Sequence, residues 1–232
     1  MTPLPPSFTA TRLGLHTVAE RIVAPARKPE NEISLRATEG GFGTPSFEHD
    51  GVPCQVRMEG AELVYARGDD ERRSLPASLA EAGELVAELL PDDGDLDRAA
   101  LEIDPGAAAA LGAWFALGQR TLTRLAAEAG ADQAPTEPLL WPEHFDLAIE
   151  SGAEAGGRRA NYGFSPGDDD HAEPYLYVGP WRGDVSGELW NATGFTGAEL
   201  GHAELLAAAD PVALALDFCR VRRRQLDSME DA

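Results

Sequence analysis

The stretch of sequence that decides the fold is "ANYGFSPGDDDHAEPYLYVGPW", Ala160 to Trp181. Its first part alternates in period two, with Tyr162 and Phe164 on one side, as in a strand that is buried on one face. Its second part does the same, because Tyr175 and Tyr177 oppose the aliphatic residues between and after them. The turn residues "SPG" follow the first part directly. The stretch therefore predicts two strands joined by a loop, with no helix between them.

The loop between these strands carries the acidic run Asp168 to Asp170, followed by His171 and Glu173. Carboxylates and one imidazole are ligands for a divalent metal. The run lacks the glycine and the distal glutamate of an EF-hand loop, however, and adjacent carboxylates repel one another unless a cation holds them. The favoured interpretation is a solvated hairpin loop, with a metal site as the alternative.

Further strands and helices lie on both sides of this stretch. "FDLAIE", Phe145 to Glu150, alternates as a strand, and so do Cys54, Val56 and Met58 ahead of an "EG" turn. Helix starts are marked by Ser, Thr or Asp caps and by proline at the first helical position. These marks stand at "SLAE" (78–81), "DP" (104–105), "TGAE" (196–199, opening a helix to about 208) and "DP" (210–211), and an N-terminal helix is expected over 11–23.

The order of these elements predicts an α+β fold. Its sheet is antiparallel or mixed and is packed against helices, and its strands come in two runs that are separated by two helices. We expect a single α+β domain over residues 1–232, with 131–138 as the place where it could divide. Gly112 and Gly118, inside the expected helix after residue 104, suggest that another backbone approaches that helix closely.

Composition narrows the classes of function. The formal net charge of −21 disfavours binding to nucleic acid or to anionic membranes. The longest apolar run is too short to cross a bilayer, and the N-terminus does not have the pattern of a signal peptide. Cys54 and Cys219 lie in apolar patterns and are expected to be buried free thiols. We expect a soluble, cytoplasmic bacterial protein.

Two histidines outside the loop are candidate site residues. His144 and Asp146 are two residues apart, so a strand through both would place them on one face, turned away from Phe145. Such a pair could line a pocket or begin a metal site, although a solvated polar face is the favoured alternative. His16, beside the apolar stripe of the N-terminal helix, is more often a hydrogen-bonded boundary residue than a ligand.

Three segments together resemble a divergent member of an uncharacterised, mostly actinobacterial family of unknown function. They are "LLWPEHFDLAIESG", "YGFSPGDDDHAEPYLYVGPW" and "WNATGFTGAELGHAELLAAADP", and "GLHTVAERIV" near the N-terminus is similar to the family's first helix with its Leu-His pair. The resemblance implies no activity and supports the fold. It covers the following positions: His16, Phe145, Asp146, Gly163, Pro166, Gly167, Glu173, Pro174 and Tyr177.

Three functions are consistent with these residues, and whether the protein is an enzyme stays open. The first is a cleft of carboxylates and aromatic rings that binds a small molecule or a protein partner. Its expected lining is His16, Trp141, Asp146, Glu173, Tyr175 and Tyr177. The second is a hydrolase that uses a divalent metal held by His144, Asp146 and His171, with Glu173 as general base. The third is a protein–protein interaction module.

Overall fold

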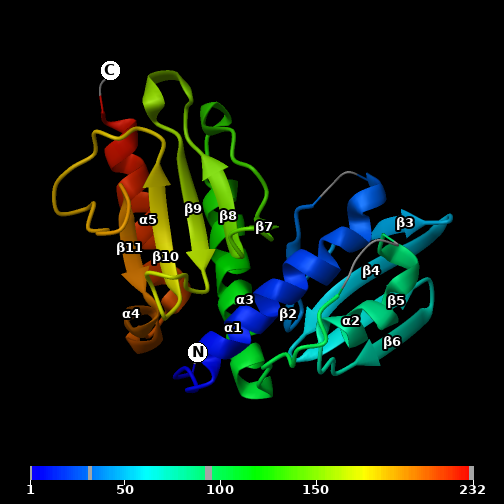
Figure 1. Ribbon diagram of the computed structural model, residues 1–232. Helices are drawn as coiled ribbons and strands as arrows, with labels where there is room; N and C mark the ends of the chain where they lie inside the picture. The colour runs from blue at the N-terminus through cyan, green and yellow to red at the C-terminus, as the bar shows by residue number, and fades with distance from the viewer. Residues whose placement is uncertain (1, 31–32, 92–95, 230–232) are drawn as a thin grey trace. The chain divides into compact units, whose positions relative to one another are not determined.

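The computed structural model describes residues 2–30, 33–91 and 96–229 (Figure 1). It has an α+β fold with two antiparallel sheets, and the strands form two runs with α2 and α3 between them, as the sequence predicts. The chain divides into two compact units. The first comprises Met1–Ala116 with Leu140–Phe145, and the second comprises Leu117–Leu139 with Asp146–Ala232. The division therefore falls inside α3, and residues 131–138 belong wholly to the second unit.

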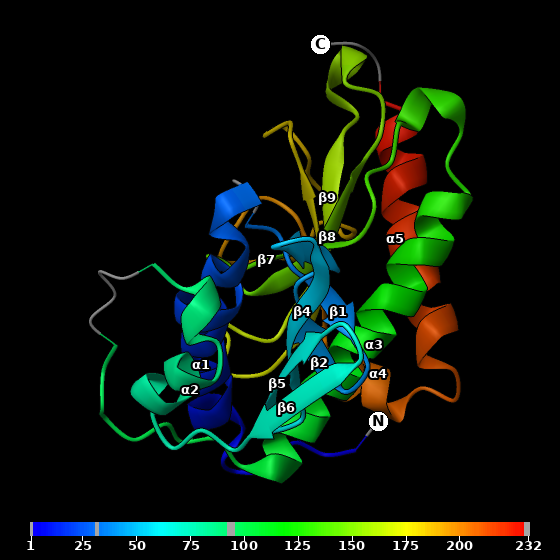
Figure 2. The same cartoon turned by 90° about the vertical axis from the view of Figure 1, so that its right-hand side faces the viewer.

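The first unit contains a six-stranded sheet in the order β1-β2-β4-β5-β6, with β3 also paired to β4. Figure 2 shows α1 and α2 on one side of this sheet. Its elements are α1 (Phe8–Val18), η1 (Ala19–Val23), η2 (Pro25–Glu30), β1 (Arg36–Thr38), β2 (Gly41–Gly43), β3 (Phe47–His49), β4 (Val52–Glu59), β5 (Glu62–Arg67), β6 (Asp70–Ser74), α2 (Leu79–Leu85) and η3 (Ala87–Leu89). The helix α3 (Pro105–Ala127) begins in this unit.

The hairpin of β4 and β5 forms as the alternation predicts. Cys54, Val56 and Met58 are buried, and the turn between the strands places Gly60 at a φ of 59°. The N-terminal helix is longer than expected, because α1 begins at Phe8. It continues without a break into the π-helical turn η1, which ends at Val23.

The caps read from the sequence also form. The Ser78 hydroxyl accepts a hydrogen bond from the Glu81 amide at 3.2 Å. The Asp104 carboxylate accepts one from the Ala107 amide at 2.9 Å. Each bond satisfies a backbone donor that the first turn of a helix leaves unpaired.

The prediction from Gly112 is confirmed, because a Cβ there would lie 2.3 Å from the carbonyl oxygen of Gly40. At Gly118, which belongs to the second unit, the close neighbour is a side chain instead. A Cβ there would lie 2.9 Å from the ring of Phe164. Only glycine allows α3 to lie so close to these neighbours.

The second unit contains a sheet in the order β11-β10-β9-β8-β7. In Figure 1, α5 and the C-terminal part of α3 lie behind strands β8 to β11. The elements are η4 (Ala131–Gln133), β7 (Leu139–Trp141), which begins in this unit, β8 (Asp146–Ser151), η5 (Ala155–Gly157), β9 (Ala160–Ser165), β10 (Tyr175–Pro180), β11 (Ala198–Gly201), α4 (His202–Ala207) and α5 (Pro211–Asp227).

The two faces of the second sheet differ because each strand alternates. Cross-strand pairing lines up one apolar set across four strands, namely Leu147, Phe164, Leu176 and Leu200, all of them buried or nearly so. This face packs against the helices, as the contact of Gly118 with Phe164 shows. The opposite face carries the polar and aromatic residues of the same strands.

One helix start is wrong. Residues 198–201, expected in a helix that opens at "TGAE", form β11 and pair with β10 from Gly201 opposite Tyr175 to Ala198 opposite Val178. The ladder bonds and the burial of Leu200 against the sheet outweigh the local capping pattern. The helix α4 starts at His202, and Glu204 accepts a hydrogen bond from the Gly201 amide at 3.1 Å.

Both cysteines are free and buried, as their apolar surroundings suggest. Burial raises the pKa of the Cys219 thiol to about 12, so this side chain is an inert thiol at neutral pH. Within the described ranges no helix is long and apolar enough to cross a bilayer.

Candidate functional site

The polar face of the second sheet brings together titratable and aromatic side chains, and we call it the tyrosine face. It consists of side chains from β8, β10 and β11 and from the two segments that flank β10. Its members are Asp146, Asp168, His171, Tyr175, Tyr177, Phe195 and Glu199. Tyr177 lies opposite Gly163 in the sheet, and Tyr175 lies opposite Ser165.

Tyr177 lies across the neighbouring strand because Gly163 leaves room for it. A Cβ at Gly163 would lie 2.4 Å from the Tyr177 ring, so no other residue fits there without moving that ring. The phenol reaches over β9 to the first residue of β8 and donates a short hydrogen bond to the Asp146 carboxylate. Burial and the neighbouring Asp146 charge raise the pKa of Tyr177 well above its ordinary value.

Tyr175 is held in the same way by a different carboxylate. Its hydroxyl donates to Asp168 Oδ2 at 2.5 Å. Burial and this hydrogen bond raise the pKa of Tyr175. Both phenols of the face are therefore neutral at physiological pH, and each is committed as a donor to a carboxylate.

His171 bridges two carboxylates. Its Nδ1 lies 3.0 Å from Asp168 Oδ1, and its Nε2 lies 3.2 Å from Glu199 Oε2. Partial burial acts to lower the pKa of His171, but the two carboxylates outweigh it and the pKa is raised. For Asp168, partial burial acts to raise the pKa, yet the hydrogen bonds from Tyr175 and His171 prevail and lower it. The two shifts both favour a protonated imidazole beside an ionised carboxylate.

The acidic run lies in a loop, as interpreted from the sequence, and its three aspartates differ in their contacts. Asp169 and Asp170 are exposed. Asp168 instead organises the loop, because it accepts from the Asp170 amide at 2.9 Å and the His171 amide at 2.8 Å, in addition to the side chains of Tyr175 and His171. Its position directly after the "SPG" turn directs its carboxylate back to the sheet.

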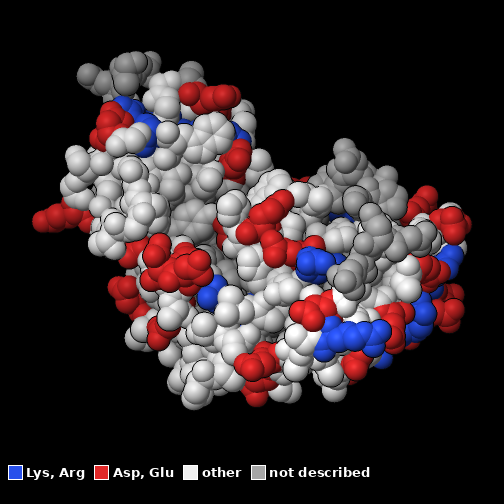
Figure 3. All heavy atoms as spheres, in the orientation of Figure 1, with Lys and Arg blue, Asp and Glu red and all other residues white. Residues whose placement is uncertain are grey.

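Four rings form a connected group on this face. The centroids of His171 and Tyr175 are 4.3 Å apart, those of Tyr175 and Tyr177 are 6.1 Å apart, and Phe195 meets Tyr177 edge-on at 6.2 Å. These spacings are typical of mutually packed aromatic side chains. Figure 3 shows that the surface over β8 to β10 is mostly uncharged, with acidic side chains at its margins.

Asp146 and His144 do not share the face of one strand. Phe145 has a φ of 54°, a left-handed conformation that interrupts the alternation, and β8 starts only at Asp146. Asp146 is consequently buried on the tyrosine face, whereas His144 lies in the preceding turn with its side chain exposed. Among the described residues, no group of three or more His, Cys, Asp or Glu side chains is arranged to hold a metal ion.

The remaining expected site residues have other surroundings. In the first unit, His16 Nε2 donates to the Pro142 carbonyl at 2.8 Å, and its ring stacks on Phe145 at 4.9 Å. Trp141, in the same unit, is 38% exposed. Glu173, in the second unit, is exposed ahead of β10. Of the expected lining, the second unit thus brings together Asp146, Tyr175 and Tyr177.

Sequence reasoning missed Phe195 and Glu199, and it did not distinguish Asp168 from the two aspartates that follow it. The glycine in "YGF", Gly163, was the signal for a side chain crossing β9, because glycine inside a strand marks the close approach of another group. Glu199 was placed in a helix, and its strand position became visible only with the pairing of β11 to β10.

The chain matches no protein-family model, no curated protein and no solved structure.

Proposed function

We propose that this protein is a binding protein whose tyrosine face holds the cationic group of a ligand. The observation that carries the proposal is the fixing of two half-buried tyrosine rings by carboxylates from separate elements, Tyr177 by Asp146 and Tyr175 by Asp168. Rings that are held before binding lose little conformational entropy when a ligand arrives.

The chemistry of the face favours a cation. The phenols stay neutral, so this face combines aromatic rings with the carboxylates of Asp146, Asp168 and Glu199. Aromatic rings attract ammonium and guanidinium groups, and a nearby carboxylate adds a charge interaction. The net charge of −21 also draws cations towards the protein as a whole.

The metal-dependent hydrolase has no comparable support. His144 lies in a turn, and both ring nitrogens of His171 are engaged by Asp168 and Glu199. Binding of a cationic group, in contrast, does not require either histidine to coordinate a metal. The cationic group could belong to a free amine or to an arginine or lysine of a partner, and the two sources require separate probes.

Isothermal calorimetry with matched probes tests the proposal. Choline and L-arginine amide should bind, and the neutral isostere 3,3-dimethylbutanol should bind more weakly or give no heat. Replacing both tyrosines, Tyr175→Leu with Tyr177→Leu, should abolish binding. Tyr162→Phe, on the opposite face of the same sheet, is the control and should bind as the unaltered protein does. Equal binding of the neutral and cationic probes would count against a cation site.

A further inference from the structure

A second feature of the second unit is an open hollow near the end of the sheet remote from Tyr175. It has a volume of about 520 Å³ and is lined by Gly156, Gly157, Arg182, Gly183 and Asp184. These residues come from η5, between β8 and β9, and from the segment that follows β10. Pro180 pairs with Ala160 at this end, whereas Tyr175 pairs with Ser165 at the other, so the hollow is separate from the tyrosine face.

Arg182 supplies the charge in this hollow. Its side chain is 9% exposed, and its Nη1 donates to the Gly156 carbonyl at 3.3 Å. The guanidinium presents its other edge to Asp184, with Nε to Oδ1 at 2.6 Å and Nη2 to Oδ2 at 2.7 Å. This two-pronged geometry is the one with which arginine recognises a carboxylate or phosphate group.

Asp184 differs from Arg182 in its burial. Its side chain is 61% exposed, and hydrogen bonding from Arg182 lowers the pKa of its carboxyl group. The guanidinium is therefore fixed by the fold, while its anionic partner sits on the surface and can be replaced by another anion at little cost to packing.

Glycines keep the space beside the guanidinium open. Gly156 and Gly157 have φ values of 78° and 64°, a left-handed backbone that other residues adopt only with strain. At Gly183 a Cβ would meet no atom within 4 Å. The walls of the hollow are thus largely backbone, and Arg182 is the cationic side chain among its lining residues.

We propose that this hollow binds a small molecule that carries a carboxylate or phosphate group. The anion takes the two-pronged position on Arg182, and Asp184 is an internal occupant that it displaces. The proposal does not depend on the function of the tyrosine face, because the two sets of residues do not overlap.

The test is a titration of the ¹⁵N-labelled protein that is monitored by ¹H–¹⁵N NMR. One series uses inorganic phosphate and the other uses acetate. Saturable shifts are expected at the amides of Gly156, Gly157 and Gly183, and the anion that saturates at lower concentration identifies the preferred class. Asp184→Asn removes the internal competitor and should tighten binding by about tenfold.

Two further variants make the test decisive. Asp169→Asn changes the net charge equally at an exposed loop position, so it controls for long-range electrostatics and should bind as the unaltered chain does. Arg182→Lys keeps the charge without the fork and should weaken binding markedly. The proposal is overturned if Asp184→Asn binds no more tightly than Asp169→Asn, or if neither anion gives saturable shifts in any of the proteins.

Discussion

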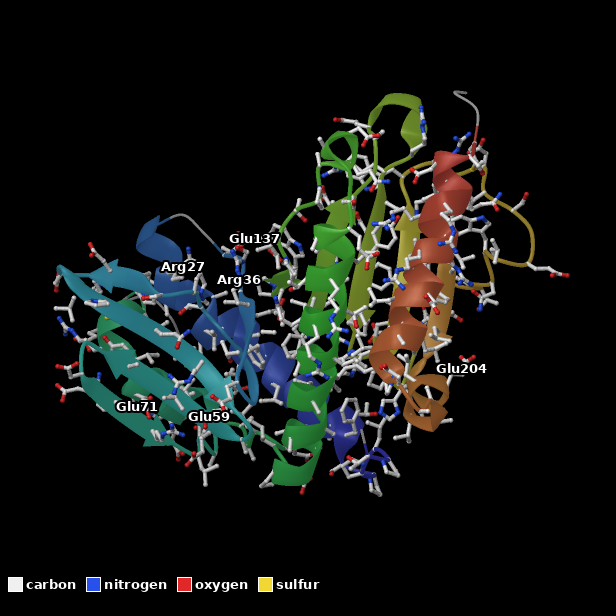
Figure 4. All side chains as sticks on the ribbon, turned by 180° about the vertical axis from the view of Figure 1, so that it is seen from behind. Arg27, Arg36, Glu59, Glu71, Glu137 and Glu204 are labelled. Carbon is white, nitrogen blue, oxygen red and sulfur yellow. The ribbon has the colours of Figure 1, made fainter. Side chains whose placement is uncertain are left out.

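Each of the two sheets of this protein carries polar residues on one face. The two faces differ in the groups that hold their carboxylates. On the first sheet, the face away from α1 and α2 carries charges that neutralise one another across strands. Arg57 pairs with Glu71 at 2.8 Å, and Arg73 pairs with Glu59 at 3.0 Å and with Glu71 at 2.8 Å. Figure 4 shows Glu59 and Glu71 on this face.

The tyrosine face of the second sheet has rings where the first has arginines. Its carboxylates are held by the phenols of Tyr175 and Tyr177 and by His171, whereas those of the first face are held by arginines. On the first face, the arginines and glutamates pair with one another, so these charges are already engaged and bind a ligand less readily. The second holds neutral rings beside carboxylates in fixed positions, which is the arrangement that we propose binds a cation.

The largest effect that separates the two faces is expected at Gly163. Gly163→Ala places a methyl group against the Tyr177 ring and should destabilise the fold by about 3 kcal/mol, the upper end of the range for overpacked sites. It should also abolish binding at the tyrosine face. Urea unfolding measures the first effect and calorimetry the second.

Gly179→Ala is the matched control, because a Cβ there would meet only the Tyr177 ring at 3.9 Å, an ordinary contact. Its expected change in stability is within about 0.5 kcal/mol. If both variants cost the same, Tyr177 does not lie across β9 as described.

A smaller effect is expected from removing one hydroxyl group on each side of the second sheet. Tyr177→Phe leaves the buried Asp146 without its phenol donor and should cost about 1–2 kcal/mol of unfolding free energy. Tyr162→Phe should be neutral or stabilising, because the buried Tyr162 hydroxyl has no hydrogen-bond partner in the described part of the chain. Thermal or urea unfolding of the two variants checks this, and equal costs would contradict it.

The pairing of His171 with Asp168 predicts a pH dependence. The raised pKa of His171 gives stability that is complete below its ordinary value of 6.5 and is lost as the pH rises through the folded value. The lowered pKa of Asp168 gives stability that is present above its ordinary value of 3.8 and is lost as the pH falls through the folded value. The pair therefore stabilises most between these two pH values.

Unfolding measured from below pH 3.8 to well above pH 6.5 should show the loss of stability on the alkaline side in the unaltered protein and its disappearance in His171→Gln. If His171→Gln loses stability at alkaline pH as the unaltered protein does, another group is responsible for that loss. Burial lowers the pKa of His202, so the contribution of this residue to the pH dependence has the opposite sign.

The smallest effect is expected on the first sheet. Arg57→Gln breaks ion pairs that lie at the surface, where salt and side-chain entropy cancel most of the gain. The loss of stability should be smaller than that of Tyr177→Phe and should vanish at about 1 M salt. A larger, salt-independent loss would show that this face is more than a solvated surface.

Much of the architecture could be predicted because local patterns agree with the tertiary fold. The alternation in β4 and β10, the proline-marked starts of α3 and α5, and the close approach at Gly112 all appear as expected. In these segments the local preference and the burial of apolar side chains act in the same direction.

The errors occur where long-range pairing decides. The capping pattern at "TGAE" is overridden by the edge of a sheet that brings residues 198–201 beside β10. The left-handed Phe145 shifts the alternation at the start of β8 and separates His144 from Asp146, and no periodic pattern shows a single backbone angle. Asp168 reads as one of three equal aspartates until the positions of Tyr175 and His171 are known.

Tetramethylammonium is the sharpest probe of the proposal that Tyr175 and Tyr177 form a preorganised platform for a cation. On titration with the unaltered protein, ring currents should move the methyl proton signal upfield, and the tyrosine ring protons should shift in parallel. The double replacement of both tyrosines by leucine should remove both changes, and Arg57→Gln should leave them intact. A methyl signal that stays at its free position, or that shifts equally with the double variant, would contradict the account.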